Sequence, residues 1–152
     1  MSFGHLNHGK SPLEVSEVTG QHSDIVSFAC AEAVNAGEWV DLDSSQAGEA
    51  RATTVVQSNA SGLCIGVALE TVSAATVAAG GARVRVCISG YVAAARTNGA
   101  VAAAGDTLIP AGGGEVTKGA ATDVLTAVGV ALAIDTGTAG NEVAPVYIFR
   151  KY

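Results

Sequence analysis

The chain has 152 residues, of which 49% are hydrophobic but only 5% aromatic and 14% charged, and its net charge at pH 7 is −6. A chain of this length is expected to form one domain. Because the chain is acidic and has no lysine or arginine cluster, we do not expect it to bind nucleic acid directly. Because it also has no apolar run of ~18 residues, we do not expect it to bind a membrane. Because the charged fraction is well below the ~25% usual for soluble domains, we expect much of the surface to be buried against protein partners.

The first predicted element is an extended N-terminal arm over residues 1–23. This stretch is polar, contains Pro12 and Gly20, and shows neither a helical nor a strand period, which is typical of a chain end that does not pack. It also lacks the basic segment and apolar run of a signal peptide. The chain is therefore expected to consist of this arm and one β-rich domain over residues 24–152.

From Asp24 onward, short apolar runs alternate with Gly, Asn, Asp and Ser, a pattern that predicts strands joined by turns. The predicted fold is all-β or β-dominated, a compact barrel-like or sandwich-like domain with at most one short helix. Residues 73–82 fit either that helix, ending at Gly80, or a loop. The predicted strands are residues 25–32, 38–42, 52–57, 63–71, 82–89, 91–95, 107–109, 115–117, 124–134 and 142–149.

Three phrases occur twice in the same order. "AGEWVDL" (36–42), "GVALETV" (66–72) and "GGARVRVCI" (80–88) correspond to "AGDTLIP" (104–110), "GVALAID" (129–135) and "GNEVAPVYI" (140–148). The repeat predicts two similar β-units with each "GVAL" strand central in its unit. An Ala-Gly-acid turn uses Gly for a positive φ and the acid to bind backbone N–H groups. The Gly of "GVAL" is expected to admit a close backbone, or a large neighbour such as Trp39 or Tyr91.

No metal or cofactor site is predicted. His5 and His8 have the spacing of two ligands to one metal ion, but a zinc site needs three or four ligands held together, and these two lie in the arm. Asp41 and Asp43 begin like a calcium loop, but Gln46 and Ala52 stand where that loop requires Gly and Glu. A solvated turn is the preferred interpretation of residues 41–49.

No catalytic residues are predicted, and the chain is not expected to be an enzyme. The glycine-rich "AGGGEVTKG" (111–119) lacks the Gly-Lys-Ser/Thr ending of a phosphate loop and is interpreted as a hairpin turn. Asp106, Asp123 and Asp135 stand beside turns, where Asp is ordinarily structural. The cysteines (Cys30, Cys64 and Cys87) have no motif spacing and lie in apolar segments, so we expect buried free thiols made in a reducing cytoplasm.

The order of these elements over residues 30–149 resembles the small capsid decoration, or cement, proteins of tailed double-stranded DNA bacteriophages. The resemblance is carried by "AGEWVDL", "GVALETVSAATVAAGGARVRVCISGYVAA", "AAGDTLIP", "GGGEVTKG" and "AVGVALAI". It implies a compact, usually trimeric β-domain without catalytic activity. Such a protein binds the outer surface of the expanded capsid, bridges neighbouring major capsid proteins and stabilises the shell against the pressure of packaged DNA.

The arm has no counterpart in the resemblance, and we expect it to contact the capsid. Its apolar residues Phe3, Leu6 and Leu13 are the predicted capsid contacts, through a strand added to an edge of the shell protein; a tail that packs on nothing is the alternative. A different functional class is also open, a carbohydrate-binding or host-surface-binding module displayed on the virion. That module would need exposed aromatic rings to stack on sugars.

Overall fold

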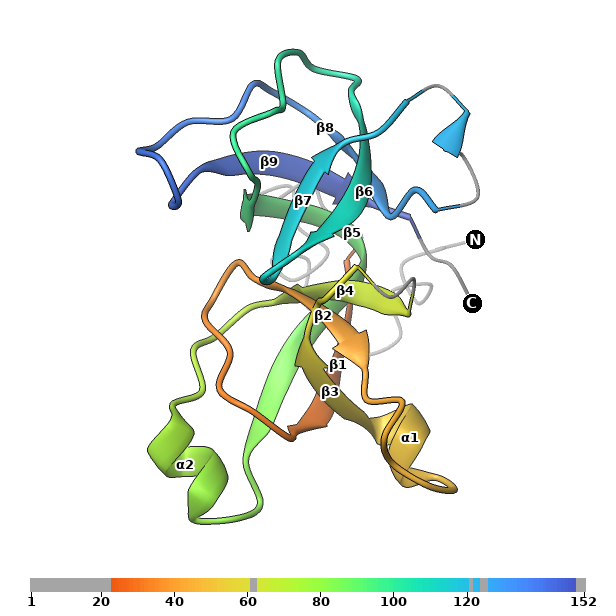
Figure 1. Cartoon of the computed structure of the whole chain (residues 1–152), viewed down its shortest axis with the longest axis vertical. Helices are drawn as coiled ribbons and strands as arrows, with labels where there is room; N and C mark the ends of the chain where they lie inside the picture. Colours follow the sequence, from red (N-terminus) through yellow and green to blue (C-terminus); the bar gives the residue numbers. More distant parts are fainter. Residues whose placement is uncertain (1–22, 61–62, 121, 124–125, 150–152) are drawn as a thin grey trace, which may run out of the picture.

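The computed structural model describes residues 23–60, 63–120, 122–123 and 126–149. The fold is β-dominated, as the sequence predicts. Figure 1 shows two groups of strands stacked along the long axis of the molecule, with one long strand passing from the first group to the second. In chain order the elements are β1 (Asp24–Cys30), β2 (Trp39–Leu42), α1 (Ala50–Thr53), β3 (Thr54–Gln57), β4 (Cys64–Ala68), α2 (Ala74–Ala78), β5 (Arg83–Arg96), β6 (Thr107–Gly112), β7 (Glu115–Lys118), β8 (Gly129–Ala131) and β9 (Val143–Ile148).

The first unit is a closed five-stranded barrel. Its strands pair in the order β1-β3-β2-β4-β5, and β5 pairs with β1 to close the ring. All pairings are antiparallel except the short parallel contact between β1 and β3. Only the first half of β5 belongs to this barrel, because its residues beyond Ser89 pair with β9.

The second unit repeats this strand order, with the second half of β5 in the place of β1. Its strands pair in the order β5-β9-β8-β6-β7, and β7 returns to the end of β5 through a parallel bridge between Val116 and Thr97. The backbone hydrogen bond from Asn98 N–H to the Val116 carbonyl (3.0 Å) corresponds to the one from Ala31 to Val55 in the first unit (3.1 Å). The predicted pair of similar β-units is therefore confirmed, and β5 is shared by both.

The repeated glycines occupy equivalent positions in the two units. Gly37 and Gly105 have φ values of +89° and +91°, and they donate to the carbonyls of Ala68 and Ala131, each at 2.8 Å. Left-handed φ values of this kind favour glycine because a Cβ would clash with the following carbonyl. The Ala-Gly-acid turns thus fix the entry to β2 and β6, as the sequence predicts.

The glycines of the two "GVAL" strands are required for a different reason, because a neighbouring strand leaves no space for a side chain. A Cβ on Gly66 would lie 2.0 Å from the carbonyl oxygen of Cys87 on β5, and a Cβ on Gly129 would lie 2.5 Å from that of Tyr147 on β9. Real Cβ atoms do not approach a backbone oxygen this closely. Of the two expected reasons for these glycines, close approach of a neighbouring backbone is the one observed.

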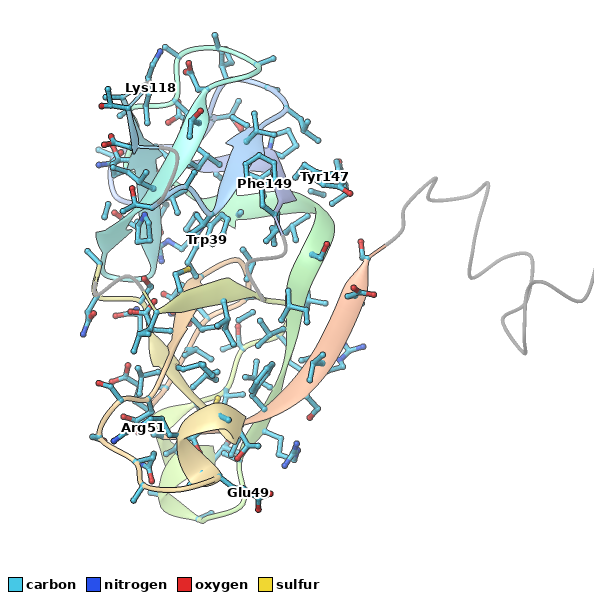
Figure 2. The ribbon with its side chains drawn as sticks, turned by 90° about the vertical axis from the view of Figure 1, so that its right-hand side faces the viewer. Trp39, Glu49, Arg51, Lys118, Tyr147 and Phe149 are labelled. Carbon is cyan, nitrogen blue, oxygen red and sulfur yellow. The ribbon has the colours of Figure 1, made fainter. Side chains whose placement is uncertain are left out.

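The two interiors differ in their contents. The first barrel is filled mainly by small branched side chains, among them Val40, Val55, Val84 and Val86. The second interior contains larger side chains, and Trp39, although it belongs to β2 of the first unit, packs into this second core. Trp39 has no exposed surface and lies between the two units (Figure 2). It therefore joins the two cores through packing.

Three details differ from the expectations drawn from the sequence. The predicted strands 82–89 and 91–95 form one strand, because Gly90, with φ +109°, lets β5 continue from the first unit into the second. The long strand expected over 124–134 is reduced to β8, and residues 124–125 lie outside the described residues. Two short helices occur where at most one was expected. Residues 73–82, for which the sequence fits either a helix or a loop, contain the helix α2. The helix α1 was not predicted, because it is a single turn without a side-chain N-cap.

Candidate interaction surface

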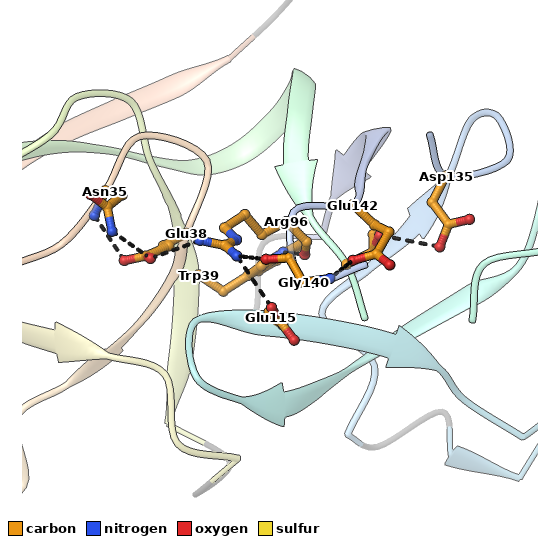
Figure 3. A network of polar contacts seen from close by, with 9 residues as sticks. Asn35, Glu38, Trp39, Arg96, Glu115, Asp135, Gly140 and Glu142 are labelled. Carbon is orange, nitrogen blue, oxygen red and sulfur yellow. Dashed lines mark hydrogen bonds and ion pairs between the residues drawn. The ribbon is translucent and has the colours of Figure 1, made fainter. Parts of the chain in front are cut away.

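A polar network, buried at Glu38 and partly exposed elsewhere, joins the two units beside Trp39 (Figure 3). Arg96, at the end of β5, contacts Glu38 of the first unit at 3.3 Å and Glu115 of β7 at 3.4 Å. It also donates to the backbone carbonyl of Gly140 in the loop before β9. Because Glu38 is almost fully buried, its charge is compensated at the junction and not by solvent.

Further hydrogen bonds hold the same junction in one arrangement. Both carboxylate oxygens of Glu38 accept from Asn35, through its backbone N–H and its side-chain amide, each at 2.8 Å. The Trp39 indole N–H donates to the carbonyl of Arg96 at 3.1 Å, and the Arg96 backbone N–H donates to the carbonyl of Gly37 at 2.8 Å. The charged groups of Glu38 and Arg96 are therefore structural, because their contacts hold the two units in a fixed relative position.

A polar pocket of about 450 Å³ lies where the ends of β2 and β3 meet the β6–β7 hairpin. Its acidic groups are occupied by local donors. Asp43 accepts from the backbone N–H and hydroxyl of Ser45 (2.9 and 2.6 Å) and from the side-chain amide of Gln46 (2.7 Å), while Asp41 accepts from the backbone N–H of Asn59 (3.1 Å). The donors from Ser45 lower the pKa of Asp43, with those from Gln46 adding to the effect. The turn expected over residues 41–49 begins only after β2, which contains Asp41. The solvated character expected of this stretch is wrong for its first two carboxylates, because Asp41 and Asp43 are both buried.

The three aspartates that the sequence places beside turns, Asp106, Asp123 and Asp135, are also structural. Asp106 accepts from the backbone N–H groups of Ala102 and Ala103 (3.0 and 2.9 Å), and its other oxygen contacts Lys118 Nζ at 2.6 Å. Asp123 accepts from Ala120 N–H at 2.7 Å, and Asp135 from Val101 N–H at 3.1 Å. Asp106 and Asp123 each close their own turn, as the sequence predicts, whereas Asp135 links its loop to residues 97–101, because it also accepts from the Thr97 hydroxyl at 3.2 Å. Among the described residues, no group of three or more His, Cys, Asp or Glu side chains is arranged to hold a metal ion.

The cysteines are buried free thiols, which confirms the sequence prediction. Burial raises the pKa of the Cys30 and Cys87 thiols, with smaller coulombic contributions from nearby carboxylates. A thiol with a raised pKa stays protonated near neutral pH and is a poor nucleophile. Both side chains therefore serve as small apolar groups of the interior. The described part of the chain contains no helix with the length and apolarity to cross a bilayer.

The clearest candidate for a contact surface is an apolar face on the outside of the second unit, which we call the aromatic face. Tyr91 of β5, Tyr147 of β9 and Val130 of β8 pair in register across the three strands, so their side chains share one face of the sheet. Figure 2 shows Tyr147 beside Phe149 on this side of the molecule. The aromatic face consists of Tyr91, Val130, Leu132, Pro145, Tyr147 and Phe149.

Three of these residues are exposed over somewhat less than half of their surface: Tyr147 is 44% exposed, Phe149 43% and Leu132 42%. The alternate residues of the same strand, Val146 and Ile148, fill the core. β9 is therefore apolar on both faces, which is the pattern of a strand covered on both sides. Exposed apolar area of this kind is characteristic of interaction surfaces.

This face was not predicted from the sequence. "PVYIF" contains no polar residue to mark its outer side, so alternation could not separate Tyr147 and Phe149 from the core. The capsid contacts predicted from the sequence, Phe3, Leu6 and Leu13, lie outside the described residues, as do His5 and His8. The aromatic face is thus the candidate interaction surface of the described domain. Comparison of the chain with protein-family models and with curated proteins finds no match.

Proposed function

We propose that this chain is a virion structural protein, a capsid decoration or cement protein of a tailed bacteriophage. In this role it binds the outer surface of the expanded capsid and bridges neighbouring major capsid proteins. It acts as a homotrimer and needs no cofactor, catalytic step, nucleic acid or membrane. The order of the repeated phrases resembles that of capsid decoration proteins. Of the structural observations, the aromatic face supports this function most strongly.

The aromatic face has the chemistry of a protein-binding surface. Tyrosine and phenylalanine are enriched at the centres of protein interfaces, where charged side chains are depleted. None of the six residues that form the face is charged. We assign this face to contacts with capsid protein and sister subunits, and the apolar arm residues Phe3, Leu6 and Leu13 to additional contacts with the capsid.

The junction between the two units supports a role as a rigid bridge. Decoration stabilises a shell by mass action, because a ligand that binds only the assembled form lowers its free energy at every occupied site. A subunit that bridges two shell proteins transmits this effect only when its own parts keep their positions. The shared strand β5, the buried Trp39 and the contacts of Arg96 with Glu38 and Glu115 provide this rigidity.

The test is co-sedimentation of the purified chain with empty shells of the source phage before and after expansion. We expect binding to expanded shells only, at a fixed number of copies per shell. The double variant Tyr147→Ser/Phe149→Ser is expected to weaken this binding at least ~100-fold, which corresponds to the loss of two aromatic contacts at an interface. The matched control is Val26→Ser, which changes a similarly exposed apolar side chain, 40% accessible, on β1 of the first unit.

Three results would contradict the proposal: no binding of the unchanged chain to expanded shells, equal binding to unexpanded shells, or equal loss of binding in the double variant and the control. The arm is tested separately by the triple variant Phe3→Ser/Leu6→Ser/Leu13→Ser. Unchanged affinity of that variant would remove the arm from the proposed contacts. It would leave the role of the aromatic face in place.

One observation favours the alternative of a carbohydrate-binding or host-surface-binding module. Tyr147 and Phe149 provide two exposed rings, and aromatic rings stack on the apolar faces of sugars. An array of bacterial surface polysaccharides separates the two functions. Polysaccharide binding that is lost in Tyr147→Ser/Phe149→Ser, together with no binding to shells, would select the alternative.

A further inference from the structure

The polar pocket where β2 and β3 meet the β6–β7 hairpin has an excess of negative charge. Its described lining contains three carboxylates, those of Glu32, Asp41 and Asp43, and no lysine, arginine or histidine. Glu32 follows β1, Asp41 belongs to β2, and Asp43 follows β2. Within the described part of the chain, neither Glu32 nor Asp43 forms an ion pair. At least these two charges are therefore not neutralised by a described cation of the same domain.

Neutral donors hold these two carboxylates in place. Glu32 accepts the backbone N–H of Gln57 at 2.6 Å, and Asp43 accepts from Ser45 and from the side-chain amide of Gln46. These bonds fix the oxygens without removing the charge, and those from Ser45 also hold the pKa of Asp43 below its usual range. Because a carboxylate has about four acceptor sites, both groups can accept further donors from a ligand.

An unpartnered hydroxyl belongs to the same pocket. Ser58 lines it, is only 1% exposed, and its Oγ has no hydrogen-bond partner among the described residues. Buried polar atoms without a partner are rare, because burial removes their hydrogen bonds to water. The backbone of Ser58 already fixes its position, since it donates to the carbonyl of Trp39 at 2.9 Å and accepts from Gly114 at 3.0 Å. The hydroxyl is therefore an acceptor that the fold itself does not use.

We propose that this acidic pocket receives a basic side chain, a lysine or an arginine, from a partner protein. The ammonium or guanidinium group donates to the acceptors that Glu32, Asp43 and Ser58 supply. A cation with several N–H donors matches this set, because all three groups accept and two of them are negatively charged. The volume of about 450 Å³ admits the end of such a side chain. A metal ion fits less well, since the described residues supply no group of three or more metal-ligating side chains around one point.

The identity of the partner rests on the proposed function. If the chain decorates a capsid, the basic side chain belongs to the capsid protein. Charged contacts of this kind accelerate association and weaken with added salt, whereas the apolar contacts of the aromatic face do not depend on charge. The pocket itself is a property of the free chain, and it is tested without a capsid.

The first measurement is an NMR titration of the full chain with blocked peptides, acetyl-Gly-X-Gly-amide, in which X is arginine, lysine or citrulline. Citrulline has the shape of arginine without its charge. We expect the basic peptides to shift the amide signals of Ser45, Gln57, Ser58 and Asn59, and the citrulline peptide to bind at least ~10-fold more weakly. No shift with either basic peptide, or equal binding of the citrulline peptide, overturns the proposal. Tighter binding of calcium ions at the same residues, with displacement of the peptides, overturns it as well.

Two variants test the acceptors. Glu32→Gln keeps an acceptor for the Gln57 N–H but removes one charge, and it is expected to weaken binding of the arginine peptide about tenfold. The matched control is Glu49→Gln, which removes the same charge outside the pocket lining, at the end of the first unit away from the second (Figure 2). Equal affinity of these two variants overturns the proposal.

Ser58→Ala is expected to weaken peptide binding while the midpoint of urea unfolding stays unchanged or rises, because the free chain loses only an unpartnered hydroxyl. A lowered midpoint would assign the hydroxyl to the fold and overturn its role in the pocket.

Co-sedimentation with expanded shells separates this proposal from the proposed function. If the unchanged chain binds shells, Glu32→Gln should bind about tenfold more weakly than Glu49→Gln at low salt. Equal binding of the two variants would overturn the assignment of the basic side chain to the capsid protein. No binding of the unchanged chain would contradict the capsid role alone, and the peptide titration would still decide whether the pocket binds a basic side chain.

Discussion

The two five-stranded units share one strand order but present different outer surfaces, and β5 displays the difference along a single strand. In the first unit β5 directs Arg83 and Arg85 outward, and Arg85 pairs with Glu70 at 3.4 Å. In the second unit the same strand contributes Tyr91 to the aromatic face. Topology therefore determines the scaffold of both units, whereas the outward side chains of β5 differ between them, charged in the first unit and aromatic in the second.

The connections between corresponding strands also differ. In the first unit, β2 and β3 are joined by residues 43–53, which include α1 and the acidic turn at Asp43. In the second unit, β6 and β7 are joined by a tight hairpin at Gly113 and Gly114, both with positive φ. A short hairpin lets the second unit approach the first closely, and Gly114 lies against Glu38 at the junction. The predicted hairpin in the glycine-rich stretch is thus confirmed, and it serves the contact between the units.

The largest expected effect tests whether the equivalent "GVAL" glycines are equally constrained. Gly66→Ala would place a Cβ 2.0 Å from a carbonyl oxygen, and Gly129→Ala would place one at 2.5 Å. Overpacking at a site without space costs about 1–3 kcal/mol and occasionally more. We expect a loss in the free energy of unfolding of about 3 kcal/mol or more for Gly66→Ala and about 2 kcal/mol for Gly129→Ala, measured by urea unfolding.

The control for these variants is Gly80→Ala. Gly80 has φ +84°, and no neighbouring atom lies within 4 Å of the position that a Cβ would take. Its replacement should cost only the left-handed backbone strain, about 1 kcal/mol. Losses for Gly66→Ala and Gly129→Ala no larger than this control would mean that the two strands can separate from their neighbours, and that the close approach is not required.

The next effect in size concerns the acid that follows the glycine of each turn. Glu38 and Asp106 hold the same position in the two units, and both accept a backbone N–H of the residue three before them, Asn35 or Ala103. Glu38 is buried with Arg96, whereas Asp106 is paired with the largely exposed Lys118. Removing one charge of a buried pair costs more than removing one at the surface. We expect Glu38→Gln to lower the free energy of unfolding by about 2 kcal/mol.

The matched variant is Asp106→Asn, for which we expect a smaller loss in the same urea experiment. Equal losses would show that the junction does not distinguish the two acids. A second readout follows the junction itself, the fluorescence of Trp39, the only tryptophan in the chain. Glu38→Gln should shift its emission to longer wavelength, because the network around the indole loosens. Asp106→Asn should leave the emission unchanged.

The features that could be predicted from the sequence depend on local chemistry, and those that were missed depend on tertiary context. The repeated turns, the strand predicted over residues 82–89 and the buried cysteines follow from positive φ, a short apolar run bounded by turn residues and apolar neighbours. The shared strand did not follow, because Gly90 resembles a strand end in sequence. The aromatic face did not follow either, because Tyr147 and Phe149 carry the same apolar signal as core residues, and only the arrangement of strands places them outside.

The smallest expected effect separates two causes of a lowered aspartate pKa, one in each unit. Lys118 is the main cause that holds the pKa of Asp106 below its usual range, whereas hydrogen bonds from Ser45 and Gln46 lower the pKa of Asp43. A carboxyl group with a lowered folded-state pKa contributes stability above the unfolded value of about 3.9 and loses it as the pH falls through the folded value. Both aspartates should therefore favour the folded state at neutral pH and lose this effect in acid.

Two variants are each expected to change the pKa of one aspartate and not of the other. The measurement is NMR of the side-chain carboxyl chemical shifts in a titration from neutral to acidic pH. Lys118→Met is expected to raise the pKa of Asp106 toward its usual value and to leave Asp43 unchanged. Ser45→Ala is expected to raise the pKa of Asp43 and to leave Asp106 unchanged. In each variant the carboxyl group would protonate at a higher pH, so acid unfolding should begin slightly earlier. A shift of both aspartates in either variant would mean that the two units are electrostatically coupled, contrary to their separate local networks.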